Sequence, residues 1–398
     1  MSRDLTEALA QRRAAGLQRA ARALLRRPLL RAVGPDSDAL PLVREHAPAL
    51  REWFDRNTGW RLTVTSEHAR LVKTTEDRTG THPAREPRSR APFSRRRYVL
   101  VCLALAALER ADAQVTLGRL GEQVLIAAAD PRLAAAGIGF TLERADERSD
   151  LVAAVRLLLD LGVLSRVAGD EDAFVRDTGD VLYDVDRRVL ASLIAAPRGP
   201  STVDAESTED RLAALTAELP ATTTDLRNQQ VRHRLTRRLL DDPVLHLDVL
   251  DEEERSYLAS QRHALTSRIT ELTGLVAEVR AEGVAMVDPS DDLADVRMPE
   301  SGTEGHATLL LAEHLAARPG GRAPLAELRA HMASLAQEHR TYWRRDAVAP
   351  GAEVLLTEQA LGRLEALDLV RRDGTDIVAR PALARYAVTA PTLTGERR

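Results

Sequence analysis

A junction that recurs along the chain most constrains how it can fold. Near Gly59, Gly162, Gly274 and Asp368 a helical pattern ends and two short strand patterns follow, at intervals of 103, 112 and 94 residues. Glycine commonly ends helices because it takes the left-handed conformation readily. The intervals suit whole domains rather than solenoid repeats of roughly 20–50 residues. The sequence therefore predicts a mainly α protein with small β-hairpins, an α+β fold with two clear modules and up to four.

The second module has the order of a winged-helix domain, in which three helices precede a β-hairpin. Its third helix carries Leu151, Val155, Leu158 and Leu159 on one face. We expect helices at Ser94–Ala111, Leu117–Ala128 and Leu142–Leu161, and strands at Val163–Val167 and Ala173–Arg176 around a turn at Gly169–Asp172.

The fourth module follows the same plan. Asp373-Gly374 is a strong hairpin signal, and Val354, Leu361 and Leu364 share one face of the preceding helix. We expect helices at Thr303–Ala317, Pro324–Glu338 and Glu353–Leu367, and strands at Leu369–Arg372 and Thr375–Ala379.

The first and third modules carry weaker signals, and the sequence leaves open whether they are true winged helices. Helix Leu40–Arg56 leads into a strand pattern at Trp60–Val64 that returns through Ala69 and Leu71, and helix Glu252–Thr273 leads into Leu275–Val279 and Val284–Val287. Three segments rich in turn-forming residues separate the modules: Thr74–Pro92, Ala196–Glu209 and Asp288–Gly305. The predicted domains are an N-terminal helical region with a hairpin at 1–88, a winged helix at 89–195, a helical middle region with a hairpin at 196–300 and a C-terminal winged helix at 301–398.

Several classes of protein are excluded or disfavoured by single residues. Lys73 is the only lysine and follows Val72, so no P-loop can exist and lysine-based catalysis is disfavoured. Cys102 is the only cysteine, which rules out an internal disulfide and a cysteine zinc site. It lies in the apolar run Tyr98–Leu108, too short for a membrane span, where we expect a buried core thiol. The N-terminus has no apolar signal core, so we expect a cytoplasmic protein.

No constellation for catalysis, cofactor binding or metal binding emerges, and we expect a protein that is not an enzyme. The ten histidines lack zinc-site spacing. The acidic pair Asp184 and Asp186 and the turn 170–172 could supply metal carboxylates, but a solvent-exposed wing is the simpler interpretation.

Arginine clusters are the best candidates for a functional site, although the chain as a whole carries a net charge of -4. The candidate DNA-contacting residues are Arg95, Arg96, Arg97, Arg344, Arg345, Arg371 and Arg372. The first three end a basic stretch that also contains Arg85, Arg88 and Arg90, and further arginines fill residues 1–35 and the helix after Asp225. Such clusters would bind phosphates without reading sequence. The alternative is a solvated face inflated by the arginine-rich codon usage of a GC-rich genome.

The charge of the third helix and wing of the second module is unfavourable for binding in a DNA groove. Residues 142–186 hold twelve acidic residues and five arginines, a net charge of −7. Phosphates would repel this surface, so we expect it to contact a protein.

The chain resembles the larger form of the KITE (MukE-like) subunit of Wadjet plasmid-defence complexes, condensin-like systems related to MukBEF. The resemblance rests on motifs that occur in order along nearly the whole chain: Ala23–Leu30, Trp53-Phe54, Gly59–Leu62, Ala69–Lys73, Arg95–Tyr98, Leu157–Leu164, Gly169–Arg176, Leu182–Arg188, Tyr257–Arg262, Glu278–Asp288 and Pro299–His306. The family offers no catalytic residue to carry over.

The resemblance implies a non-enzymatic subunit with tandem winged helices that forms a homodimer and binds the kleisin linking the heads of an SMC ATPase. It further implies contact with double-stranded DNA during loop extrusion, while a separate toprim-type nuclease cuts circular plasmids. The alternative is a free-standing tandem winged-helix DNA-binding protein, a transcription regulator or a replication initiator. The sequence does not decide between plasmid defence and chromosome organisation, or whether this subunit itself touches DNA.

Overall fold

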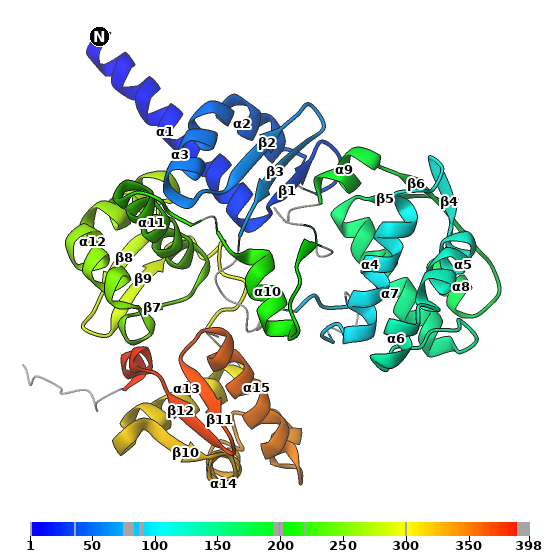
Figure 1. The fold of residues 1–398 in the computed structure, drawn as a ribbon. Coiled ribbons are helices and arrows are strands. Elements are labelled where there is room, and N and C mark those ends of the chain that lie inside the picture. The colour runs from blue at the N-terminus through cyan, green and yellow to red at the C-terminus, as the bar shows by residue number, and fades with distance from the viewer. Residues whose placement is uncertain are drawn as a thin grey trace, which may run out of the picture.

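The chain folds as a mainly helical protein with small three-stranded antiparallel sheets, the α+β class expected from the sequence (Figure 1). The computed structural model describes residues 2–35, 37–74, 83–86, 91–193, 199, 202–218, 220–298 and 301–387. Within them, the helices and strands form four units, each with one sheet. The predicted boundaries at 88–89, 195–196 and 300–301, together with Arg88 and Arg90, fall wholly or partly outside the described residues.

The elements of the first two units are as follows. Unit 1 contains α1 (Ser2–Arg26), β1 (Leu29–Arg31), α2 (Ala39–Glu45), α3 (Ala47–Thr58), β2 (Arg61–Val64) and β3 (His68–Val72). Unit 2 contains α4 (Arg95–Leu108), β4 (Gln114–Thr116), α5 (Leu117–Ala128), α6 (Pro131–Ala135), α7 (Ala145–Leu161), β5 (Leu164–Gly169), α8 (Glu171–Val175), β6 (Val181–Val185) and α9 (Arg187–Ser192).

Helix α10 (Thr208–Thr216) precedes the last two units. Unit 3 contains α11 (Thr224–Asp241), β7 (Leu245–His246), the 3-10 helix η2 (Leu247–Val249), α12 (Glu252–Thr273), β8 (Val276–Val279) and β9 (Gly283–Val287). Unit 4 contains α13 (Thr303–Ala317), η3 (Pro319–Gly321), β10 (Arg322–Pro324), α14 (Leu325–Glu338), η4 (Arg345–Val348), α15 (Ala352–Ala366), β11 (Val370–Asp373), β12 (Asp376–Ala379) and η5 (Pro381–Tyr386).

All four sheets have the same topology. A short strand after the first helix pairs with the second strand of the hairpin, giving the orders β1-β3-β2, β4-β6-β5, β7-β9-β8 and β10-β12-β11. The residue between the long helix and the hairpin has a positive φ in every unit: 66° at Gly59, 75° at Gly162, 74° at Gly274 and 53° at Asp368. This left-handed residue stops the helix and turns the chain into the first hairpin strand.

Units 1 and 3 pack directly against each other. Helix α3 contacts α11, and α1 contacts α12. Leu272 of α12 belongs to the core of unit 1, while Trp53 of α3 and Leu240 of α11 pack against the cores of both units. Units 2 and 4 each have a core of their own. In Figure 1 the blue helices of unit 1 accordingly lie beside the yellow-green helices of unit 3.

Polar contacts connect the remaining units to this pair. Arg27 of α1 forms a 2.7 Å ion pair with Asp160 of α7. His246 of β7 lies 3.1 Å from the carbonyl oxygen of Asp368 in unit 4. No helix in the described part of the chain is both long and apolar enough to cross a bilayer.

The structure corrects the predicted wing of unit 2. Residues Ala173–Arg176 are not a strand: the chain forms α8 there, because Asp170 caps that helix by accepting the N–H of Asp172 at 3.2 Å. The returning strand is β6, five residues further along the chain.

Two predictions about burial were wrong. Cys102 is exposed, not a core thiol. The buried side of α4 is formed by Leu100, Val101, Ala104 and Leu108, and Cys102 lies off that stripe because successive helical residues point about 100° apart. Val354 is 38% exposed and does not share the buried face of Leu361 and Leu364.

Candidate nucleic-acid interface

The three arginines at the start of α4 are positioned by the helix N-terminus. The Ser94 side chain caps α4 by accepting the N–H of Arg97 at 3.3 Å. The partial positive charge of a helix N-terminus disfavours cations, so this cluster requires a nearby anion. Asp150 of α7 supplies it, accepting from the Nε atoms of Arg96 and Arg97 at 2.6 Å each.

The charges of Arg96 and Arg97 are balanced by those of Asp150 and Asp146, which leaves Arg95 as the unpaired cation of this cluster among the described residues. Asp146 accepts a second contact from Arg96 at 3.4 Å. Partial burial opposes the charge of Arg96, but its hydrogen bond to Asp150 and the charge of that carboxylate outweigh burial and raise the pKa of Arg96. Arg96 and Arg97 therefore hold α4 on α7. Arg95 is exposed, and no ion pair with another described residue involves it.

In unit 4, one of the two neighbouring arginines is also engaged. Arg344 donates to Glu304 at 2.9 Å and lies 3.0 Å from Asp346. Arg345 is exposed and has no ion-pair partner within the described ranges. The neighbouring Tyr342 is 85% exposed.

The arginines of the last hairpin divide in the same way. Arg372 on β11 donates to Glu365 at 2.7 Å and to Glu358 at 2.8 Å. Burial opposes its charge, yet these two glutamates raise the pKa of Arg372. Arg371 is exposed, and the described part of the chain offers it no ion-pair partner.

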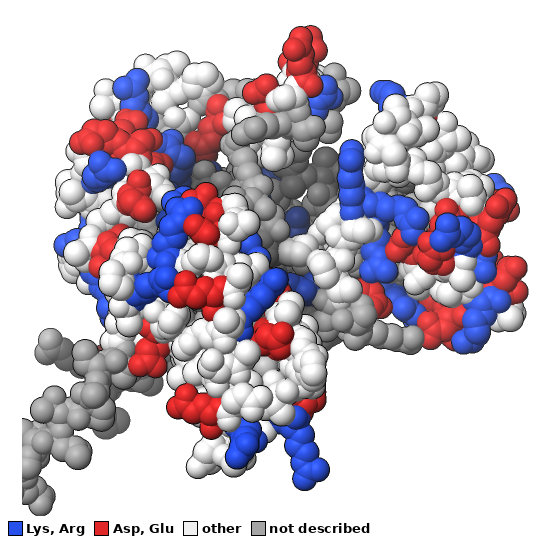
Figure 2. All heavy atoms as spheres, turned by 90° about the horizontal axis from the view of Figure 1, so that it is seen from below, with Lys and Arg blue, Asp and Glu red and all other residues white. Residues whose placement is uncertain are grey.

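Of the seven candidates, Arg95, Arg345 and Arg371 are exposed and have no ion-pair partner among the described residues, whereas the exposed Arg344 and Arg372 are held in ion pairs. They lie on units 2 and 4, whose cores are separate. Figure 2 shows that positive and negative side chains are interspersed over the face seen from below, without a broad basic surface. Any duplex contact through these residues would involve few phosphates.

Two arginines of the basic helix after Asp225 have structural roles. Arg237 of α11 is 5% exposed and donates to the carbonyl oxygen of Thr58 at 2.6 Å. Arg234 pairs with Glu254 at 3.0 Å. These side chains join α11 to its neighbours and are not available to phosphates.

The helices that would face DNA in a winged helix carry acidic residues. Helix α7 begins with Asp146, and α15 carries Glu353, Glu358 and Glu365. Asp146, Glu358 and Glu365 form ion pairs with arginines of the same units, which offsets part of this negative charge. Neither helix therefore presents an unpaired basic face to the phosphates of a groove.

Unit 4 also exposes apolar side chains around the start of α15, which the sequence analysis missed. They are Tyr342, Val348, Val354 and Leu355, exposed by 85%, 39%, 38% and 54%. Val354 and Leu355 are consecutive on α15, and a contiguous patch of exposed apolar side chains is typical of a protein-binding surface. The 3.6-residue pattern of α15 could have signalled this, since its apolar residues are too many for one buried stripe.

The acidic residues that could have supplied metal ligands stabilise the fold of unit 2 instead. Asp184 accepts from Gln114 at 2.8 Å, and Asp186 caps α9. Glu171 is 2% exposed, accepts from Arg166 at 2.9 Å and from the hydroxyl of Tyr183 at 2.9 Å. Throughout the described ranges, no three His, Cys, Asp or Glu side chains converge as metal ligands.

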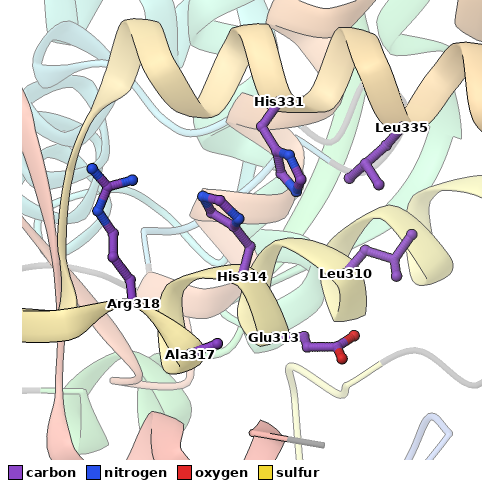
Figure 3. Close-up of a pocket in the computed structure, with 7 residues that line it drawn as sticks. All are labelled: Leu310, Glu313, His314, Ala317, Arg318, His331 and Leu335. Carbon is purple, nitrogen blue, oxygen red and sulfur yellow. The ribbon is translucent and has the colours of Figure 1, made fainter. Parts of the chain in front are cut away.

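A small pocket of about 420 Å³ lies between α13 and α14 (Figure 3). His331 of α14 points toward His314 of α13, and their rings stack with centroids 4.0 Å apart. Burial, and then the neighbouring His314, lower the pKa of His331, while Glu338 and Glu327 oppose this shift. The lowered pKa favours the neutral form of His331, and the stacked rings pack α13 against α14.

The geometry defines a mainly helical protein built from repeated small α+β units. The chain belongs to the DUF2398 family, described as a protein of unknown function, whose model matches residues 21–389. Neither a curated protein nor a solved structure matches the chain.

Proposed function

We propose that the protein is a non-enzymatic KITE-type subunit of an SMC (condensin-like, Wadjet) complex, in the cytoplasm, that binds the kleisin and DNA. The observation that carries the proposal is the fourfold occurrence of one topology: helix, strand, helices and a hairpin with the last strand central. This is the topology of winged-helix domains, so we interpret all four units as winged helices.

The charges support a role in binding proteins more than in reading DNA sequence. Four of the seven candidate arginines form ion pairs within the chain, mostly with carboxylates of α7 and α15. Arg95, Arg345 and Arg371 remain for phosphate contacts, which give weak, salt-dependent affinity without sequence preference. The apolar residues exposed at the start of α15 offer a surface for a kleisin segment or a second copy of the chain.

In this proposal ATP hydrolysis belongs to the SMC ATPase, and plasmid cleavage to a toprim-type nuclease. The absence of a P-loop from the sequence is consistent with that division of labour.

The alternative is a free-standing winged-helix DNA-binding protein, a transcription regulator or a replication initiator. Selection of bound duplexes from a random pool, followed by affinity measurements over a range of salt, separates the two. The subunit proposal predicts no enriched sequence and affinity that falls with salt. An enriched motif bound more tightly than random DNA would favour the alternative.

A further inference from the structure

Units 1 and 3 have the same elements at a constant spacing along the chain. Strands β2 and β8 begin and end 215 positions apart, the difference between 61 and 276, and so do β3 and β9. Helices α1 and α11 end at positions 26 and 241, with the same spacing. The register agrees too, since Arg61 pairs with Val72 and Val276 pairs with Val287.

The sequence repeats where the structure repeats. Residues 17–30 read LQRAARALLRRPLL and residues 232–245 read RHRLTRRLLDDPVL, with identical residues at six of 14 positions. Together with the constant spacing, these identities point to a duplicated segment rather than two unrelated units.

The helix ends of the two units have the same local structure. Thr58 and Thr273 each donate their hydroxyl to the carbonyl four residues earlier at 2.6 Å, and each accepts the N–H two residues later at 3.2 Å. The next residues, Gly59 and Gly274, have φ values of 66° and 74°.

Each helix end is contacted by the other unit through equivalent residues. Arg237 of α11 donates from Nε to the carbonyl oxygen of Thr58 at 2.6 Å, and Arg22 of α1 donates from Nη1 to that of Thr273 at 3.0 Å. Each arginine also pairs with an acid at 2.8 Å, Arg22 with Asp288 and Arg237 with Glu218.

The same reciprocity extends one helical turn back. A Cβ at Gly274 would lie 2.1 Å from the Nε2 atom of Gln18, and a Cβ at Gly59 would lie 2.7 Å from the Nδ1 atom of His233. Gln18 and His233 are again 215 positions apart. Both glycines therefore permit the close approach of a side chain from the opposite unit.

Contacts in which residue i of one copy meets residue j of the other, and the reverse, define an isologous two-fold interface. We propose that units 1 and 3 are an internal duplication paired about a pseudo-two-fold axis, so that one chain contains the interface that two copies of a shorter chain would form. The partner of this face is the other half of the same chain, and the face is closed to a second copy.

One consequence concerns DNA. Helices α3 and α12, the helices directly before the hairpins, pack on the opposite unit, so neither can enter a groove. Contacts with DNA or with other proteins would then be made by units 2 and 4. The inference does not depend on the proposed function, because it rests on contacts within the chain.

The test uses the full chain with Arg22→Ala and Arg237→Ala. Arg19→Ala and Arg227→Ala are matched controls, since each removes an exposed arginine from the same helix. Hydrogen exchange is followed at the α3–β2 and α12–β8 junctions. Each of the first two variants should speed exchange roughly 10- to 100-fold at both junctions, because they lose a charged hydrogen bond in one shared interface, and the controls should not. The milder Arg22→Lys and Arg237→Lys variants should show the same pattern if the alanine variants fold poorly.

Protection at both junctions should also be unchanged across a tenfold range of protein concentration. An effect confined to the mutated unit would overturn the proposal. So would protection that rises with concentration, or a dimer that dissociates in both alanine variants and not in the controls, because either result would place these contacts between chains.

Discussion

Replacing Arg96 and Arg97 together with alanine should destabilise unit 2, because both side chains neutralise one nearly buried carboxylate. Asp150 is 8% exposed and accepts from both arginines at 2.6 Å. Stripping a fully buried charge of its partner costs about 3–5 kcal/mol. The Arg96 side chain is 32% exposed, and solvent screening reduces the loss, so we expect about 2 kcal/mol for the double variant. In a domain of roughly 100 residues this lowers the unfolding midpoint by about 8–16 °C.

Thermal unfolding, with hydrogen exchange to assign the transition to α4 and α7, measures this effect. Arg95→Ala is the matched control and should stay within about 0.5 kcal/mol of the native chain. Adding Asp150→Asn to the double variant removes the stranded charge and should restore part of the stability. An Arg96→Ala, Arg97→Ala chain that unfolds with the native transition would refute the reasoning, since the ion pairs would then contribute nothing.

The other predictions concern the core, the exposed arginines and pH. Leu158 is completely buried in unit 2, so Leu158→Asp should unfold that unit through an unpaired buried charge, and a soluble variant with native circular dichroism would contradict this. Arg345→Ala with Arg371→Ala should weaken duplex binding about equally for all sequences and reduce the salt slope by about one per lost phosphate contact, as fluorescence anisotropy would show; an unchanged slope would leave them as solvated residues. Because the pKa of His331 in the folded chain lies below its unfolded value, the folded state binds fewer protons and unit 4 should lose stability as pH falls below about 6.5. His331→Gln should flatten that dependence in urea titrations at several pH values, and a native-like slope would argue against it.

The strong periodic patterns predicted much of the fold. The limits of α12, α13 and α5 match the expected helices, and β9 and β11 lie within a residue of the expected strands. Their signals were local: an amphipathic stripe, a helix-ending glycine or an Asp-Gly turn. The helix expected at Leu40–Arg56 divides into α2 and α3 because Pro48 lies in the first turn of α3, where proline is well tolerated.

Features that depend on distant partners escaped prediction. Strands β1, β4, β7 and β10 have two or three residues, and each exists because a hairpin strand far along the chain pairs with it. Two or three residues are too few to show a period. The pairing of units 1 and 3 was missed for a similar reason, since the identities between their helices are visible only when positions 215 apart are compared.

The sequence predicted which residue type forms the candidate site, but not which of its arginines are free and which form ion pairs. Sequence reasoning selected arginines by clustering, yet whether an arginine is free depends on acids far away in the chain. Arg97 and Asp150 are 53 positions apart and form an ion pair in the fold. Arg95 and Arg371, in similar sequence surroundings, remain exposed.

The most direct test of the central claim is assembly. The chain is co-expressed with the products of its neighbouring genes, purified by a tag and passed through size-exclusion chromatography with light scattering. The account predicts a stable complex that contains an SMC ATPase and a kleisin together with this chain. Elution of the chain without either protein, when both are expressed and soluble, would contradict it.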